Sequence, residues 1–223
     1  MFKKILTSAL IAGAAAGLIA GLLQFFFVQP ILLHAEMFET GQLIHNGSSA
    51  AQFDMPPYEM QRNLLSLAFA MLTFAGFALV LVALMNVAES RGATINGRTG
   101  LLWGIAGFVV FHLAPGFSLP PEVPGSSAAD IGDRQVWWYG TVLATALAIW
   151  LIAFVQNRLA WIAAIVLFLA PHVIGAPQPE FFAGTAPTEM GGYFASRSLG
   201  VSMAAWSVLG VLAGYLWSSS DEA

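Results

Sequence analysis

The sequence contains no cysteine and very little charge. Without cysteine, neither a disulfide framework nor a thiolate metal site can form, so any metal must be held by His, Asp, Glu, Met or backbone oxygens. Charged residues make up 9% of the 223 residues, against about a quarter in a typical soluble domain. Because 58% of the chain is hydrophobic, a water-soluble fold would lack the polar surface to cover itself. The composition therefore predicts an integral membrane protein.

Further absences exclude several functions. Lysine occurs only at Lys3 and Lys4, so no Walker A loop exists and the chain cannot hydrolyse ATP through one. No basic patch indicates a nucleic-acid partner. No carboxylate lies in the middle of an apolar run, which argues against a buried proton relay. We find no cluster that would activate a nucleophile, and we expect neither an enzyme nor a prosthetic group.

Long apolar runs dominate what is present. A helix of about 20 apolar residues crosses the hydrocarbon core, which is about 30 Å thick. We predict an all-α, polytopic transmembrane helical bundle of about six spans, with five as the rival because the third and fifth runs are short. We expect a single integral membrane domain over 1–223, with repeated helical hairpins at about 1–90, 98–157 and 158–219. The runs are approximately Ile5–Leu33, Asn63–Val87, Leu101–Phe117, Val136–Val155, Leu159–Ile174 and Leu199–Trp217.

Basic residues orient these spans, because loops rich in Lys and Arg stay in the cytoplasm. Six spans with cytoplasmic termini put five basic residues inside and three outside. We therefore expect a multi-pass protein of the bacterial inner membrane with both termini cytoplasmic. The first run, which follows Lys3 and Lys4, is too long for a cleaved signal peptide and is interpreted as a retained anchor. Aromatic side chains at the span ends, including Trp137, Trp161 and Trp217, are interpreted as interfacial anchors.

This topology places the histidines and most acids on the outer face. A membrane protein with positive loops inside leaves acids outside by default, but that rule does not explain why every histidine is outside too. The four histidines are His34, His45, His112 and His172. The nine outer acids are Glu36, Glu39, Asp54, Glu59, Glu122, Asp130, Asp133, Glu180 and Glu189.

An internal repeat links two of the hairpins. Leu113-Ala114-Pro115 and Leu169-Ala170-Pro171 each end an apolar run, and each is followed by a proline-flanked glutamate and then an arginine. Residues 55–62 show a fainter copy. Proline removes a backbone donor, so we expect each helix to break or bend near Pro115 and Pro171 and the two hairpins to superpose.

Glycines recur four residues apart on one face of the first helix, at Gly13, Gly17 and Gly21. Glycine at this spacing lets another backbone approach closely, so this face is expected to pack against a neighbouring helix. Two weaker versions of the same signal are Gly100 with Gly104 and Gly210 with Gly214.

Candidate metal ligands come from the outer face. Imidazole and carboxylate suit borderline divalent cations such as Co(II), Ni(II) and Zn(II), whereas the methionines Met37, Met55, Met60 and Met190 admit Cu(I). The alternatives are that these side chains are merely solvated, or that His112 and His172 bond a carbonyl left free by a nearby proline. Arginines 62, 134 and 197 either reach the lipid headgroups or each pair with an acid of their own loop. The candidate ligands are His34, Glu36, His112, Glu122, His172 and Glu180.

Nearly the whole chain resembles the CbtA family. The resemblance is carried by Met1-Phe2-Lys3-Lys4 before an Ala/Gly/Leu helix, by Gln29-Pro30 with His34-Ala35-Glu36, and by the distinctive block from Leu113 to Trp138. That block includes Leu119-Pro120-Pro121-Glu122-Val123-Pro124-Gly125, Ala128-Ala129-Asp130 and Arg134-Gln135-Val136-Trp137-Trp138. Pro171-His172-Val173-Ile174-Gly175-Ala176-Pro177 completes the pattern.

The resemblance implies a cobalt transporter subunit with about five spans. It also implies a small one-span, histidine-bearing partner, CbtB, and a role in supplying cobalt for cobalamin. We therefore expect a membrane subunit for divalent cobalt uptake, with Co(II) as the transported ion and an outer His/carboxylate uptake site. The alternative is an integral-membrane scaffold or assembly subunit that binds a partner protein and never transports metal itself.

Overall fold

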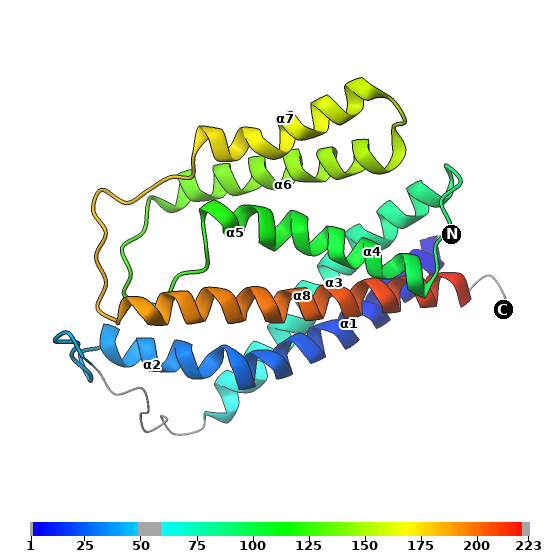
Figure 1. The fold of residues 1–223 in the computed structure, drawn as a ribbon. Coiled ribbons are helices and arrows are strands. Elements are labelled where there is room, and N and C mark those ends of the chain that lie inside the picture. Colours follow the sequence, from blue (N-terminus) through cyan, green and yellow to red (C-terminus); the bar gives the residue numbers. More distant parts are fainter. Residues whose placement is uncertain (1, 49–58, 220–223) are drawn as a thin grey trace. The chain divides into compact units, whose positions relative to one another are not determined.

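The computed structural model describes residues 2–48 and 59–219, and these residues form helices and no strand. The helix α4, the short π-helix η1 and α5 follow one another directly and form one helical stretch, Gly97–Ser118. The elements, labelled as in Figure 1, are α1 (Phe2–Phe27), α2 (Gln29–Glu39), α3 (Met60–Glu89), α4 (Gly97–Phe108), η1 (Val109–Leu113), α5 (Ala114–Ser118), α6 (Ile131–Phe154), α7 (Arg158–Ile174) and α8 (Thr188–Ser219).

Five helical stretches of the described chain are long and apolar enough to cross a membrane, which confirms the predicted class of fold. They are α1, α3, the stretch Gly97–Ser118, α6 and α8. The third run was expected to be short, but its helix starts earlier, at Gly97, because Asn96 caps it by accepting from the backbone N–H groups of Arg98 (2.9 Å) and Thr99 (3.1 Å). The fifth run stays short, since α7 has 17 residues.

The chain divides into two compact units. Unit 1 comprises Met1–Gln29, Pro56–Phe108 and Gly200–Ala223, and unit 2 comprises Pro30–Met55 and Val109–Leu199. The division falls inside α8 and between α4 and η1, so both units draw on the same long helical stretches. The two units do not test the three predicted hairpins, which concern the order of the spans along the chain. The hairpins remain a prediction.

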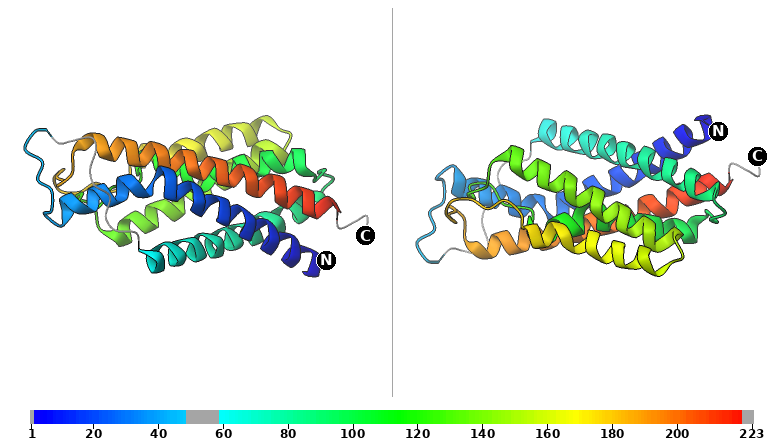
Figure 2. Two further views of the ribbon diagram at one scale, coloured as in Figure 1. Left: turned by 90° about the horizontal axis from the view of Figure 1, so that it is seen from below. Right: turned by 90° about the horizontal axis from the view of Figure 1, so that it is seen from above.

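In unit 1, the glycine face of α1 packs directly on α3, as the sequence predicted. A Cβ added at Gly13 would lie 2.5 Å from the Cα of Ala75, and one added at Gly17 would lie 2.5 Å from the Cα of Met71. Figure 2 shows α1 (blue) and α3 (cyan) crossing in both views. Side chains larger than hydrogen at these two positions would force the helices apart.

The two weaker glycine pairs pack against each other. A Cβ at Gly104 would meet the carbonyl oxygen of Trp206, and one at Gly100 would meet the carbonyl oxygen of Gly210. The α4 backbone therefore lies against the α8 backbone. Trp206, 1% exposed, stacks at a tilt on Phe77 with ring centroids 4.9 Å apart.

The first turn of α1 and the last turns of α3 and α8 meet at one end of unit 1 (Figure 1). The Lys4 Nζ lies 4.0 Å from the centroid of the Trp217 ring, and the Trp217 indole N–H donates to Glu89 Oε2 at 3.0 Å. Trp217 is 1% exposed, so the expectation of an interfacial anchor is wrong for this residue. The described ends of the first and last helices lie on the same side of unit 1.

In unit 2, α6 and α7 form an antiparallel hairpin and lie side by side (Figure 1). Each helix has a side-chain cap, because Asp130 accepts from the Gly132 N–H (2.8 Å) and Asn157 accepts from the Ala160 N–H (2.7 Å). The indole N–H of Trp137 donates to the Pro171 carbonyl at 3.1 Å and so ties the start of α6 to the end of α7. Trp137 is 9% exposed, and the expectation of an interfacial anchor is wrong for it as well.

The two Leu-Ala-Pro segments differ in local structure. The π-helix Val109–Leu113 lies directly before Pro115, and the helical stretch ends at Ser118. By contrast, α7 continues through Pro171 and ends at Ile174, before Gly175 with φ of 88°. The loops after the two segments pair with each other through an isolated antiparallel bridge between Ser126 and Gly184. Superposition of the two hairpins remains a prediction, and residues 55–58, the first half of the fainter copy, lie outside the described residues.

Candidate functional site

All six predicted ligands and all four histidines belong to unit 2. Unit 2 also holds Glu36, Glu39, Glu122, Asp130, Asp133, Glu180 and Glu189, whereas Glu59 belongs to unit 1 and Asp54 lies outside the described residues. Apart from Glu59, the described residues that the sequence assigns to the outer face therefore all belong to unit 2.

His172 lies near the end of α7 in a partly buried aromatic setting. Its Nδ1 is 2.8 Å from the Ser118 hydroxyl at the end of α5. The ring of Phe117 stands edge-on to the imidazole at a centroid distance of 5.3 Å, and Trp137 does so at 6.2 Å. The partner of His172 is therefore a hydroxyl from another helix, and the Pro171 carbonyl accepts from Trp137 and from the Gly175 N–H (3.0 Å).

Glu122 pairs with the arginine of its own loop. Arg134 Nη2 donates to Glu122 Oε2 at 2.9 Å, with the side chains 28% and 31% exposed respectively. This is one of the two roles that the sequence left open for the arginines. An ion pair about a third exposed contributes about 0–1 kcal/mol to stability, so its main consequence is to orient the Glu122 carboxylate and offset its charge.

His34 is buried on α2, at 8% exposure, with its ring 5.3 Å from that of Phe38. Phe38 and Ala35 pack with Val123 of the 119–130 loop and Met190 of α8 in a small hydrophobic cluster. Burial lowers the pKa of His34 below the usual imidazole value. Because a neutral imidazole is the form that binds metals, this shift favours the ligand form of His34.

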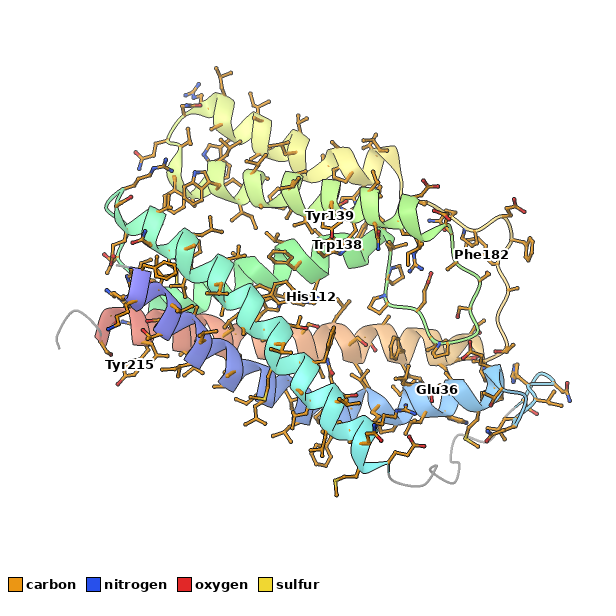
Figure 3. All side chains as sticks on the ribbon, turned by 180° about the vertical axis from the view of Figure 1, so that it is seen from behind. Glu36, His112, Trp138, Tyr139, Phe182 and Tyr215 are labelled. Carbon is orange, nitrogen blue, oxygen red and sulfur yellow. The ribbon has the colours of Figure 1, made fainter. Side chains whose placement is uncertain are left out.

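His112 lies on the π-helix. The ring of its neighbour Phe111 lies 6.2 Å from the ring of Trp138 on α6, and Figure 3 shows His112 on the stretch after α4, with Trp138 and Tyr139 on α6. The Nε2 atom of His112 is buried. Short π-helical segments inside α-helices occur frequently at functional sites, and this one carries a candidate ligand.

Glu180 is exposed on the 175–187 loop. Ser127 of the other loop holds the adjoining residues in place, because its hydroxyl lies 2.9 Å from the Phe181 carbonyl and 2.9 Å from the Ala183 nitrogen. The Ser127 N–H also donates to the Ala183 carbonyl at 2.8 Å. The loop that carries Glu180 is thus fixed to the loop that carries Glu122.

The candidate ligands are not gathered into one metal cage. Within residues 2–48 and 59–219, no group of three or more His, Asp or Glu side chains is placed to hold a metal ion together. The arrangement can instead offer a divalent ion one or two ligands at a time, from histidines of low to intermediate exposure and from loop carboxylates. Sequence reasoning missed Ser118 and Ser127, because a lone serine gives no signal of a partner 54 to 56 residues away.

Five membrane-length helices define a polytopic integral membrane protein, and its four histidines all belong to one compact unit. The chain belongs to the CbtA family, because the family model described as "Probable cobalt transporter subunit (CbtA)" matches residues 2–218. No curated protein and no solved structure gives a significant match to the chain.

Proposed function

We propose that this subunit admits divalent cobalt across the membrane through unit 2. In this proposal the ion is handed along His34, Glu36, His112, Glu122, His172 and Glu180. The observation that carries the proposal is that all four histidines of the chain belong to unit 2, in a family described by cobalt transport.

The ligand chemistry fits passage better than storage. Imidazole nitrogen and carboxylate oxygen are appropriate donors for Co(II). An ion that must cross has to bind well enough to enter and weakly enough to leave, over several sites. Ligands used one or two at a time meet that requirement, whereas a closed cage of three or four histidines would retain the ion.

The contacts of each residue define its part. The bond to Ser118 occupies Nδ1 of His172, which makes Nε2 the nitrogen for a metal. Arg134 offsets the charge of Glu122, so this carboxylate holds a passing cation less tightly than an unpaired one would. Burial favours the neutral form of His34.

The proposal places the histidines and loop carboxylates of unit 2 on the outer side of a bacterial inner membrane and both termini in the cytoplasm. The basic residues Lys3, Lys4, Arg91, Arg98 and Arg158 would then lie on the cytoplasmic side, which basic residues favour. An inward-moving cation is then driven by the membrane potential, which supplies about 2.3 kcal/mol per charge per 100 mV. A small one-span, histidine-bearing subunit of the CbtB kind would add ligands that this chain lacks.

Radioactive cobalt uptake into proteoliposomes tests this function. Vesicles with the chain, alone and with the one-span subunit, are compared with protein-free vesicles under an inside-negative potassium diffusion potential, and Ni(II), Zn(II) and Cu(I) are used as competitors. The proposal expects potential-dependent cobalt uptake above the protein-free level. Uptake that never exceeds that level, with the chain correctly inserted and its partner bound, would favour the scaffold alternative.

A further inference from the structure

Unit 2 exposes apolar side chains just beyond the end of α7. The last two residues of α7, Val173 and Ile174, are 82% and 79% exposed, and Phe181 and Phe182 are 70% and 83% exposed. We refer to these four residues as the α7 rim. In Figure 3 the labelled Phe182 lies on the loop that follows α7. Together these four exposed side chains form an apolar patch, and such patches mark protein or membrane interaction sites.

The loop holds these phenylalanines at a fixed place. The Phe181 carbonyl accepts from the Ser127 hydroxyl at 2.9 Å, and Ala183 is bonded to Ser127 through both its N–H and its carbonyl. The bridge between Ser126 and Gly184 continues this pairing. The backbone on either side of Phe182 is therefore anchored while its side chain points to the surroundings.

The length of α7 indicates what covers the rim. At 17 residues and about 1.5 Å per residue, α7 is about 25 Å long, whereas the hydrocarbon core is about 30 Å thick. A crossing that starts at Arg158 would thus end about 5 Å beyond Ile174, at the level of the loop. Trp161, 52% exposed, lies at the other end of α7, where an interfacial aromatic is expected.

The exposed face of α7 leads into the rim without interruption. Ile162, Val166, Leu169 and Val173 follow helical spacing and are 58%, 59%, 55% and 82% exposed. A row of this kind on a membrane helix faces lipid. The 175–187 loop adds one charged residue, Glu180, whose neighbour Phe181 begins the aromatic pair.

We propose that the α7 rim inserts into the headgroup region of the bilayer and makes α7 the sixth membrane crossing. Phe181 and Phe182 supply the apolar contact that a 17-residue helix lacks, and Trp161 anchors the opposite end. A short helix in a thicker bilayer is otherwise accommodated by thinning the membrane or by reaching with flanking residues. The partner is a lipid surface, and this inference does not depend on the transport of any metal.

Spin-label depth measurements test the insertion, and the absence of cysteine makes single labels unambiguous. A nitroxide is placed at Phe182→Cys, with Leu143→Cys on the spanning helix α6, 64% exposed, as the lipid control and Ser48→Cys as the aqueous control, in vesicles of phosphatidylethanolamine and phosphatidylglycerol. Collision with oxygen, which concentrates in lipid, is compared with collision with a water-soluble nickel chelate. The rim label should give an oxygen-to-nickel ratio between the two controls and well above that of Ser48.

Two results would overturn the insertion. A ratio at Phe182 equal to that at Ser48 would place the rim in water. Exclusion of both reagents would mean that protein covers the rim, either a second copy or another subunit.

A second variant tests the anchoring itself. With the label at Ile174→Cys, the double change Phe181→Ser and Phe182→Ser should raise the accessibility of the label to the nickel chelate at least twofold, and unchanged accessibility would contradict the anchoring. Neither measurement uses cobalt, so a result against insertion would leave the proposed cobalt transport untouched.

Discussion

The contact between α1 and α3 gives the sharpest stability prediction, through Gly17→Ala. The new Cβ would lie 2.5 Å from the Cα of Met71 and 2.7 Å from the carbonyl oxygen of Ala70. Because carbon atoms pack at about 3.5–4.0 Å, the two backbones must separate by about 1 Å. Overpacking of a tight contact costs about 1–3 kcal/mol, partly offset by the gain of about 0.5–1 kcal/mol when alanine replaces glycine in a helix. The net expectation is a loss of about 1–2 kcal/mol.

Gly76→Ala on α3 is the matched control, since a Cβ there meets nothing within 4 Å. Here the helix gain remains without the clash, and we expect stabilisation of about 0.5–1 kcal/mol. Both variants are unfolded with dodecyl sulfate in mixed micelles, and the helical circular dichroism is followed. The difference between the two free energies of unfolding should be about 2 kcal/mol. Equal shifts in both variants would refute the close packing of α1 on α3.

Three further predictions concern unit 2 and the topology. Burial lowers the pKa of His34, so as the pH falls through about 6.5 the imidazole binds a proton in the unfolded chain before it does so in the folded chain. Wild type should therefore lose thermal stability between about pH 7 and about pH 5.5, and His34→Gln should lose less. Trp137→Phe removes the bond to the Pro171 carbonyl and should lower the free energy of unfolding by about 0.5–1.5 kcal/mol, while Trp161→Phe, at an exposed position, should change it little. Single cysteines at positions 48, 126 and 188 should react with an impermeant maleimide from outside in whole cells, and one at position 90 should not; protection of position 188 alone among the first three would favour five spans.

The sequence predicts the packing of helices well because that signal is local. Glycines four residues apart mark a face whatever the partner is, and both Gly13 and Gly17 indeed meet α3. The order of the spans also groups all four histidines, and all four belong to unit 2; their place on the outer face remains a prediction. The pairing of Arg134 with Glu122 was among the alternatives, since the two residues are 12 positions apart in one loop.

What the sequence does not show depends on contacts between distant segments. Hydropathy places a tryptophan at the end of a span without saying which way it faces, and both Trp137 and Trp217 turn inward to a hydrogen-bond acceptor. The bond between His172 and Ser118 joins positions 54 apart. The π-helix at Val109–Leu113 adds one residue to a turn, a change too small to alter the apolar pattern.

Cobalt uptake by histidine variants tests the central claim most directly. Initial rates are measured in cells at matched membrane abundance for wild type, His112→Ala and His172→Ala, with His45→Ala, an exposed position outside the helices, as the control. The account predicts that His112→Ala and His172→Ala lose at least about tenfold in rate, equivalent to about 1.4 kcal/mol, while the His45→Ala control stays near wild type. Unchanged rates and unchanged cobalt affinity in both histidine variants would contradict it.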